Sequence, residues 1–292
     1  MNIHIIGNCQ ARPIATYLGH ALGNRDYSLI LWPELHLIRE DECSRLTNSL
    51  QDADVLICMP VGDNYRSMPL GSSQIAGHCP PHCKIIIYPN SYFKGYHPTF
   101  DYARDKNGNH ILASDPLIKG VNPFTDYHDA EAAILCLTND NSEDLIFDKY
   151  IEKLSLDTDG LEDIVLDSLA EIERRDAACS FSLHPIIKTQ YQANKLFHSF
   201  NHPTNALLKI VASKILDETG LADEDSTFSS ELDDTEFLGH PNLPIMPSIH
   251  DALNLRFAPL GLDQMRQQYF QYFTFIRMNS RLFTSVFLQG NS

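Results

Sequence analysis

The amino-acid sequence predicts an α/β fold, in which a doubly wound, mainly parallel, flavodoxin-like sheet precedes a large helical C-terminal portion. Short apolar runs recur up to residue 88, and segments of helical length separate them, as a parallel sheet covered on both faces requires. After residue 102 helical periodicity dominates. With 292 residues, 43% of them hydrophobic, the chain is long enough to bury a large core.

Four strands are expected in the first part of the chain. The first covers residues 3–6 and ends at Gly7, and an amphipathic helix begins near Pro13. Proline suits a first helical position, because its missing N–H would have no intrahelical partner there. The remaining strands are expected at 27–31, 54–59 and 84–88. Open α/β sheets bind ligands beyond the carboxyl ends of such strands.

The rest of the chain is expected to be mostly helical. Stretches of helical period cover 129–137, 142–154, 161–178, 204–219, 248–256 and 262–277. The last of these carries an aromatic stripe, which is typical of core packing. Residues 217–236 hold many acids and no Lys or Arg, so we predict a solvated excursion there. We predict a single domain over 1–292, sheet-forming in 1–100 and mostly helical in 101–292.

One further strand is expected at residues 195–200, directly before the turn Asn201-His202-Pro203. If this strand joins the sheet in parallel, Cys9 and His202 emerge at the same edge. A nucleophile and a base far apart in sequence would then lie close in space.

The composition excludes several classes of function. A net charge of −16 and a pI near 5.1 argue against a nucleic-acid partner or an anionic membrane surface. We expect neither a secretory signal nor membrane insertion, because the apolar runs are far shorter than the roughly twenty residues of a membrane span. The seven cysteines are odd in number and scattered, which favours a reducing cytoplasm.

Cys9 lies in the expected turn between the first strand and the first helix. A thiol near the positive end of a helix dipole has a lowered pKa and forms the nucleophilic thiolate more readily. The alternative is a small buried cysteine that fills space between strand and helix. Geometry alone leaves both interpretations open.

Other polar residues follow the third and fourth strands. The backbone N–H of Gly62 is suited to bind an oxyanion, and Arg66 to bind a phosphate or carboxylate, although Gly-Asp-Asn is also ordinary turn chemistry. The loop 89–98 combines aromatics, an amide, a cation and a histidine, as a carbohydrate or nucleotide surface does. Four strand ends therefore carry polar candidates.

The segment His78-Cys79-Pro80-Pro81-His82-Cys83 offers four metal-binding side chains. Its spacing matches no common structural zinc site, and two prolines stiffen the loop. We therefore expect no metal and interpret the segment as a turn before the strand at 84–88.

Four motifs, in chain order, resemble the WcbI-type polysaccharide biosynthesis acetyltransferase family. They are G-N-C-Q-A at 7–11, Y-R at 65–66, P-N-S-Y-F-K-G-Y-H-P at 89–98 and F-N-H-P-T-N at 200–205. The resemblance implies a variant of the SGNH-hydrolase-like fold that binds coenzyme A (CoA) and O-acetylates a capsular or exopolysaccharide sugar. Asn8 and Cys9 stand where SGNH enzymes have Asp and Ser. Ser199 stands where the carboxylate that orients the SGNH base would be.

The resemblance implies a Cys9–His202 dyad with acetyl-CoA as co-substrate. His202 would act as general base, and Cys9 would accept the acetyl group. The residues expected to hold the tetrahedral oxyanion are Asn8, Gly62 and Asn90. The residues expected to bind the coenzyme are Gly7, Gln10, Arg12, Arg66, Lys94, Tyr96 and His97, with Arg12 and Lys94 directed at its phosphates.

Three alternatives stay open at this stage. The acetyl group could pass directly to the acceptor, with Cys9 only lining the site. The protein could be a cysteine-dependent, SGNH-like esterase acting on acylated glycans, or a non-catalytic glycan- or nucleotide-binding module. The expected partners are a small-molecule acyl donor and a sugar or polysaccharide acceptor, and a homo-oligomer is compatible with the sequence.

Overall fold

The computed structural model describes residues 1–23, 26–156, 160–222, 228, 232 and 234–288. They form two compact units, and each unit draws on several segments of the chain. Unit 1 comprises Met1–Tyr92, Ser168–Gln190 and Asn201–Gly239, and unit 2 comprises Phe93–Asp167, Tyr191–Phe200 and His240–Ser292. The single domain expected from the sequence stays a prediction.

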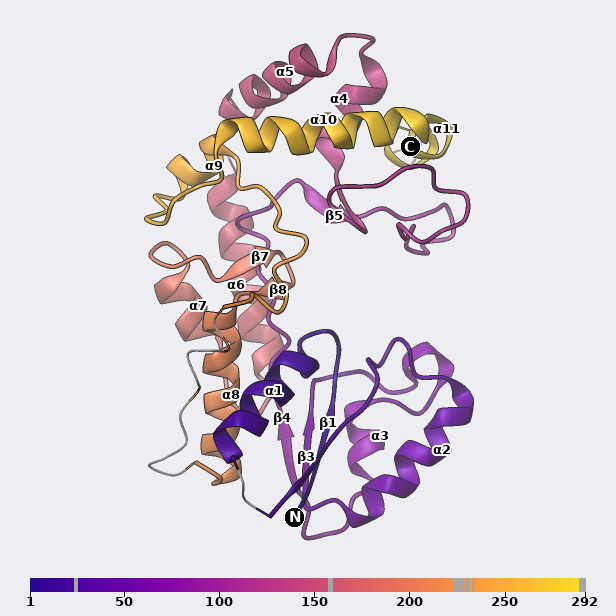
Figure 1. Ribbon diagram of the computed structural model, residues 1–292, viewed down its shortest axis with the longest axis vertical. Helices are drawn as coiled ribbons and strands as arrows, with labels where there is room; N and C mark the ends of the chain where they lie inside the picture. The colour runs from indigo at the N-terminus through magenta and orange to yellow at the C-terminus, as the bar shows by residue number, and fades with distance from the viewer. Residues whose placement is uncertain (24–25, 157–159, 223–227, 229–231, 233, 289–292) are drawn as a thin grey trace. The chain divides into compact units, whose positions relative to one another are not determined.

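Unit 1 contains a four-stranded parallel sheet with the order β2-β1-β3-β4 (Figure 1). The strands are β1 (Asn2–Ile6), β2 (Ser28–Leu31), β3 (Val55–Cys58) and β4 (Lys84–Ile87). All neighbouring pairs are parallel, so the four carboxyl ends share one edge. This strand order is the same as that of the first four strands of a flavodoxin-like sheet. The predicted α/β fold with a parallel sheet is confirmed.

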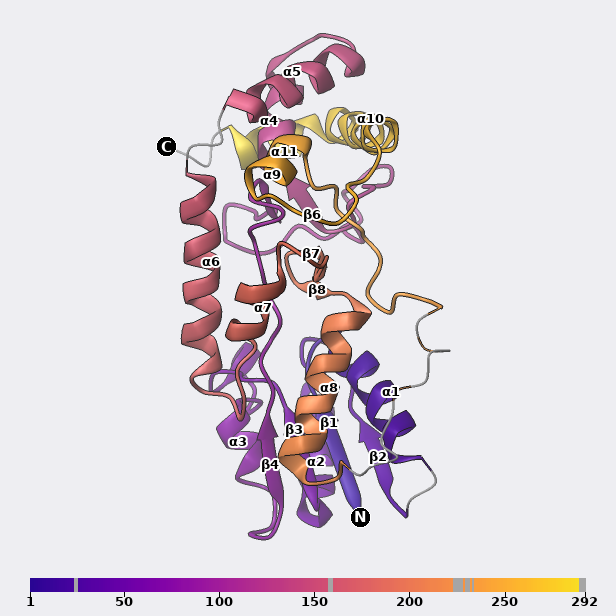
Figure 2. The same ribbon diagram turned by 90° about the vertical axis from the view of Figure 1, so that its left-hand side faces the viewer.

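Helices cover both faces of this sheet (Figures 1 and 2). On one face lie α1 (Ala11–Leu22) and α8 (Asn205–Thr219), and on the other lie α2 (Glu40–Ser49) and α3 (Ser72–Ala76). Side chains alternate along each strand, so Ile6, Leu56 and Cys58 join the core under α2 and α3. Two short 3₁₀ turns, η1 (Leu50–Asp52) and η2 (Tyr65–Ser67), complete the connections.

The first helix begins earlier than predicted. Helix α1 starts at Ala11, so Pro13 is its third residue rather than its first. A proline is tolerated anywhere in the first turn, because those N–H groups have no intrahelical partners. The turn that holds Cys9 is therefore shorter than predicted and comprises residues 7–10.

The strand expected at residues 195–200 exists but does not belong to the parallel sheet. It is β7 (Phe197–Ser199), and it pairs with β8 (His202–Pro203) in a two-stranded sheet of its own. The chain reverses immediately after β7, so its backbone groups are paired locally. The prediction that this strand brings Cys9 and His202 to one sheet edge is therefore wrong.

Unit 2 is mainly helical around a short antiparallel sheet of β5 (Phe100–Tyr102) and β6 (Tyr127–Asp129). Its helices are α4 (Ala130–Thr138), α5 (Glu143–Leu156), α9 (Pro247–Ala252), α10 (Leu262–Met278) and α11 (Ser280–Phe287). Helix α6 (Leu161–Asp176) has residues in both units, and α7 (His184–Gln190) belongs to unit 1. The strands β5 and β6 were not predicted, because three residues are too few to show a period of two.

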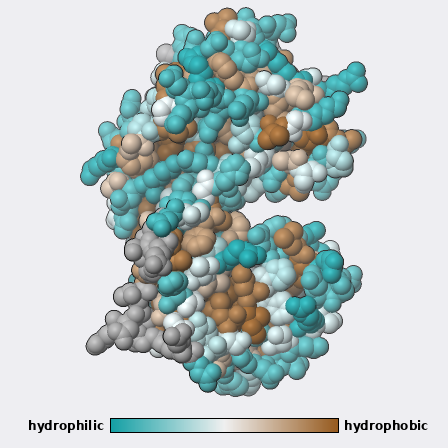
Figure 3. All heavy atoms as spheres, in the orientation of Figure 1, coloured by the Kyte–Doolittle hydropathy of each residue, from teal (hydrophilic) through white to brown (hydrophobic). Residues whose placement is uncertain are grey.

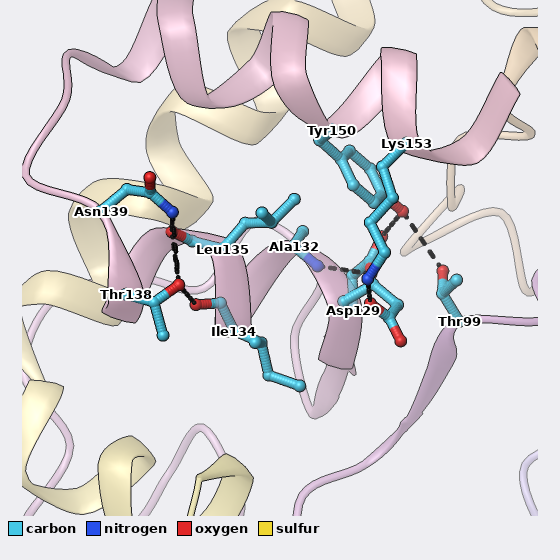
Figure 4. A network of polar contacts seen from close by, with 10 residues as sticks. Thr99, Asp129, Ala132, Ile134, Leu135, Thr138, Asn139, Tyr150 and Lys153 are labelled. Atoms are coloured by element: carbon cyan, nitrogen blue, oxygen red, sulfur yellow. Dashed lines mark hydrogen bonds and ion pairs between the residues drawn. The ribbon is translucent and has the colours of Figure 1, made fainter. Parts of the chain in front are cut away.

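A buried carboxylate organises the centre of unit 2 (Figure 4). Asp129 is fully buried and accepts hydrogen bonds from the hydroxyls of Tyr150 and Tyr269, the latter at 2.5 Å, and from the Ala132 N–H at 3.1 Å. Burial raises the pKa of Asp129, and the three donors oppose that rise. Four of the five aromatic residues predicted as a packing stripe in α10 are buried, and Phe270 is half-buried, so the stripe is mainly core packing; the buried ones are Tyr269, Tyr272, Phe273 and Phe275.

Two buried histidines make the stability of unit 2 sensitive to acid. Burial lowers the pKa of His97 and of His128 from the ordinary value of 6.5 to about 3 each. Each ring is neutral in the folded state, so its contribution to stability is complete above pH 6.5 and is lost as pH falls toward 3. The expected loss is up to about 1.4 kcal/mol per pH unit for each histidine.

Thermal denaturation between about pH 8 and about pH 4 measures this effect. His128 packs against Phe275 and Phe283, and His128→Phe should reduce the slope while also removing the contact between its Nδ1 and the Tyr272 hydroxyl at 3.4 Å. A slope that is unchanged in this variant would show that His128 does not couple folding to protons.

Hydrophilic residues dominate the visible face of both units, with a hydrophobic patch on unit 1 (Figure 3). Of the acidic segment 217–236, residues 223–227, 229–231 and 233 lie outside the described residues. Its end is packed rather than detached, since Glu236 accepts a hydrogen bond from the N–H of Asn205 at 2.8 Å, at the start of α8. In the described part of the chain, no helix is long and apolar enough to cross a membrane.

Candidate functional site

Cys9 lies in the tight turn between β1 and α1, as the sequence predicted. The Ala11 N–H donates to the carbonyl of Asn8 at 2.9 Å, and the Gln10 N–H donates to the Asn8 side-chain oxygen at 3.0 Å. From the loop after β2, the Leu35 N–H donates to the carbonyl of Gly7 at 2.8 Å. These bonds fix the turn and leave the side chain of Cys9 half-buried.

The side-chain amide of Gln10 is the centre of a buried polar network. Its Nε2 lies 3.1 Å from Oδ1 of Asn90 and 3.0 Å from the carbonyl oxygens of both Ser91 and Asn201, to which it donates. Its Oε1 accepts from the Ser91 N–H at 3.1 Å. One side chain therefore joins the turn after β1, the loop after β4 and the segment that leads into α8.

This network brings the two expected catalytic segments together by a route that the sequence did not indicate. Gln10 directly follows Cys9, and Asn201 directly precedes His202, so the bond between Gln10 and Asn201 joins their neighbours. Both Cys9 and His202 are half-buried. The link is a side-chain amide rather than a shared sheet edge. A direct hydrogen bond between Cys9 and His202 stays a prediction.

Asn8 and Asn90, both expected near the oxyanion, contact each other. Nδ2 of Asn8 donates to Oδ1 of Asn90 at 3.0 Å, which leaves Asn8 with its amide engaged. Among the described residues, no side chain or backbone oxygen accepts from Nδ2 of Asn90. Asn90 therefore keeps a hydrogen-bond donor for a ligand, whereas the main role of Asn8 is to position the side chain of Asn90.

A cavity of about 660 Å³ opens beside Asn90 in unit 1. Its lining comes from the segments after β3 and β4, from α3 and from the end of α6. The lining residues are Pro60, Val61, Gly62, Ser72, Ser73, Ala76, Ile87, Asn90, Arg174, Arg175 and Ala178. Two expected site residues, Gly62 and Asn90, thus lie on one cavity at the carboxyl edge of the sheet.

Two cavity residues, Arg174 and Arg175, were not predicted. Nε and one terminal nitrogen of Arg174 each donate to Glu171 at 2.7 Å, and Nε of Arg175 donates to it at 2.6 Å. These bonds lower the pKa of Glu171 to about 2, so it stays ionised. The Arg175 guanidinium also lies 5.1 Å from the ring centre of Tyr92. Adjacent arginines in a chain of net charge −16 were the signal in the sequence.

The Cys9 thiol is not acidified. Its burial, followed by the negative charge of Glu34, raises its pKa to about 11, and hydrogen bonds from the backbone at Cys9 and Gln10 only partly oppose this. The expectation of a lowered pKa at the helix terminus is therefore wrong for the protein alone. At neutral pH Cys9 is a protonated thiol, and nucleophilic chemistry there requires a base.

Three further predicted residues lie elsewhere in unit 1. Gly7 is buried, and a Cβ atom there would lie 1.9 Å from the hydroxyl oxygen of Tyr88, which directly follows β4. Arg12 is exposed, and its guanidinium has no hydrogen-bond or ion-pair partner among the described residues, so it can bind an anion. Arg66 is exposed and donates to the carbonyl of His36, away from the cavity lining. A coenzyme role for Arg66 is not supported by this contact.

Lys94, Tyr96 and His97 belong to unit 2. Lys94 forms an ion pair with Asp101 at 2.8 Å. Tyr96 is fully buried and donates to backbone carbonyls, including that of Asn194 at 3.1 Å, and His97 is buried beside it. These are the contacts of core residues. They do not support the predicted binding of the coenzyme by Tyr96 and His97.

The segment 78–83 forms a turn before β4. The Cys83 N–H donates to the carbonyl of Pro80 at 2.9 Å. Within the described ranges, no group of three or more His, Cys, Asp or Glu could hold a metal ion.

Comparison with known proteins agrees with this architecture. A family model described as polysaccharide biosynthesis enzyme WcbI matches residues 2–224. The chain is also similar to a solved structure of WcbI, described as a novel polysaccharide biosynthesis enzyme, with a TM-score of 0.75 and 19% identity over 98% of this chain and 94% of that one. That structure is described as native protein without a disulfide bond between CoA and one of its cysteines. No curated protein matches the chain. The match over residues 2–224 shows that the chain belongs to the WcbI family of polysaccharide biosynthesis enzymes.

Proposed function

We propose that the protein is an O-acetyltransferase that moves an acetyl group from acetyl-CoA to a sugar of a capsular polysaccharide or exopolysaccharide. The observation that carries this proposal is the Gln10 network, which gathers the segments of Cys9, Asn90 and His202 at the carboxyl edge of the sheet. Membership of a polysaccharide biosynthesis family supports a sugar acceptor. The related WcbI structure is described with reference to CoA, and this supports acetyl-CoA as the donor.

The cavity beside Asn90 is suited to the donor. CoA carries phosphate groups, and the guanidinium groups of Arg174 and Arg175 supply positive charge and hydrogen-bond donors to such groups. Their bonds to Glu171 hold both side chains in place, which lowers the entropy lost on binding. Arg12, in the first turn of α1, adds a further cation.

The chemistry follows from the protonated state of Cys9. His202 takes the thiol proton, and the Cys9 sulfur attacks the carbonyl carbon of the thioester. The CoA sulfur leaves and takes the proton back from His202, so Cys9 carries the acetyl group. A sugar hydroxyl then attacks, His202 accepts its proton, and Cys9 leaves as a thiolate that regains this proton. Nδ2 of Asn90 and the N–H of Gly62 are the proposed oxyanion donors.

The proposed setting of the reaction is the cytoplasm. All seven cysteines are free, as a reducing cytoplasm would keep them. The acceptor is a sugar or a growing polysaccharide, and no nucleic acid is involved. The net charge of −16 supports the exclusion of nucleic acid.

Calorimetric titration with CoA tests the donor site. We expect the unmodified protein to bind CoA, and Arg174→Ala and Arg175→Ala each to weaken binding by roughly 10–100-fold, because each removes charged hydrogen bonds of about 1.5–3 kcal/mol. Arg39→Ala is the matched control, since this arginine is exposed, does not line the cavity and forms ion pairs with Asp41 and Glu42. It should leave CoA affinity within about twofold.

Absence of CoA binding by the unmodified protein at millimolar concentration would contradict the proposal. Release of CoA from acetyl-CoA in the presence of a glycan acceptor separates a transferase from the alternatives. Hydrolysis of an aryl acetate without CoA would instead favour the esterase, and CoA-independent glycan binding without turnover would favour a binding module.

A further inference from the structure

Tyr88 has a buried hydroxyl that the architecture of unit 1 does not explain. It directly follows β4, and its side chain is fully buried. No hydrogen-bond partner for its hydroxyl occurs among the residues that the structure describes. Buried polar groups are almost always paired, because an unpaired one lowers the stability of the fold. An unpaired hydroxyl therefore calls for a functional explanation.

The hydroxyl of Tyr88 lies directly against the turn that holds Cys9. A Cβ atom added to Gly7 would lie 1.9 Å from the Tyr88 hydroxyl oxygen. This oxygen thus fills the space that any side chain at position 7 would need. Burial is the main cause of the raised pKa of Tyr88, and the nearby thiols of Cys58 and Cys9 add to it. The hydroxyl is therefore placed under the nucleophile's turn and close to it.

Other side-chain donors of this turn are already used. The amide of Asn8 donates to Asn90, and the amide of Gln10 donates to three oxygen atoms. Burial raises the pKa of Tyr88 well above that of ordinary tyrosine, so the phenol keeps its proton at every working pH. Tyr88 thus brings to this turn a donor that has no partner among the described residues and never ionises.

We propose that Tyr88 donates a hydrogen bond to the Cys9 sulfur when that sulfur becomes negatively charged. The proposal rests on the proposed function insofar as acyl transfer makes Cys9 ionise. The proton of the thiol leaves to the base, and Tyr88 retains its own proton and only shares it. A hydrogen bond to a charged acceptor is about twice as strong as one to a neutral group, so the donor stabilises the thiolate more than the thiol. Tyr88 thereby offsets the burial and the negative charge of Glu34, which disfavour the thiolate.

Alkylation of Cys9 by iodoacetamide tests the proposal without any enzymatic assay. Peptide mass spectrometry of the full-length chain gives the rate at Cys9 separately from the other six cysteines. We expect Tyr88→Phe to move the pH midpoint of alkylation upward by one unit or more, so that the rate at each lower pH falls roughly tenfold or more. The melting temperature should not fall, because the variant removes an unpaired hydroxyl.

Tyr27→Phe is the matched control. The hydroxyl of Tyr27 donates to the carbonyl of Gly19 at 3.0 Å, near the far end of α1. This variant should lower the melting temperature and leave the alkylation of Cys9 unchanged. 3-Fluorotyrosine at position 88 keeps the hydroxyl and makes it a stronger donor. It should move the midpoint downward, and it keeps the test decisive if Tyr88→Phe folds poorly.

An unchanged alkylation profile in both Tyr88 variants would overturn the proposal. A fall in melting temperature for Tyr88→Phe with unchanged alkylation would assign the hydroxyl a purely structural role, such as binding an ordered water. If the acetyltransferase proposal is wrong, the result differs: the unmodified protein shows no acetyl-CoA turnover, but the alkylation of Cys9 still responds to substitution of Tyr88.

Discussion

Replacing His202 with alanine is expected to slow acetyl transfer by roughly 10²–10⁴-fold, the usual contribution of a general base, while CoA affinity changes only a few-fold. The base matters here because the Cys9 thiol, with a pKa raised to about 11, is protonated at neutral pH. Cys9→Ser should fold normally and lose more than about 100-fold in turnover, because a hydroxyl ionises far less readily than a thiol. Steady-state kinetics and calorimetry on the same preparations measure both effects.

Matched controls separate these losses from general damage. His20→Ala changes an exposed histidine in the last turn of α1, and Cys83→Ser changes a half-buried thiol of the turn before β4. Both should retain transfer. Full transfer by Cys9→Ala would exclude the acetyl-cysteine and leave direct transfer driven by His202. Unchanged turnover in His202→Ala would exclude the dyad.

Gly7→Ala is expected to have a large effect on stability. The new Cβ would lie 1.9 Å from the hydroxyl oxygen of Tyr88 and 3.1 Å from Cβ of Ala11. Tyr88 is fully buried at the end of β4, so its ring has no open space into which to move. Overpacking of this kind costs about 1–3 kcal/mol or more, and the shift of the turn should lower turnover as well.

Chemical denaturation of three variants measures this effect. Gly62→Ala is the control for stability, because a Cβ at position 62 meets no atom within 4 Å, and it should change the free energy of unfolding by less than about 0.5 kcal/mol. The double variant Gly7→Ala/Tyr88→Phe removes the nearest contact and should recover part of the loss, as expected for residues that touch. A Gly7→Ala variant as stable as the unmodified protein would show that Tyr88 can move to accommodate the new Cβ atom.

The sequence determined the sheet and the position of the nucleophile's turn. The apolar runs at 3–6 and 54–59 became β1 and β3, because a strand buried on both faces has to be apolar throughout. The run at 84–88 became the edge strand β4, in which Lys84 and Ile85 are exposed. The break at Gly7 followed by a helical period placed Cys9 at a carboxyl edge. These features depend on neighbouring residues only, so a single sequence contains them.

Tertiary structure alone decided how the site is assembled. Gln10 meets Asn201 across 191 positions of the chain, and the pKa of Cys9 is set by burial and by Glu34, against the local influence of the helix terminus. The strand near 197 pairs locally instead of joining the sheet. Burial and hydrogen bonding of this kind depend on which distant segments pack together, and periodicity in the sequence does not encode that choice.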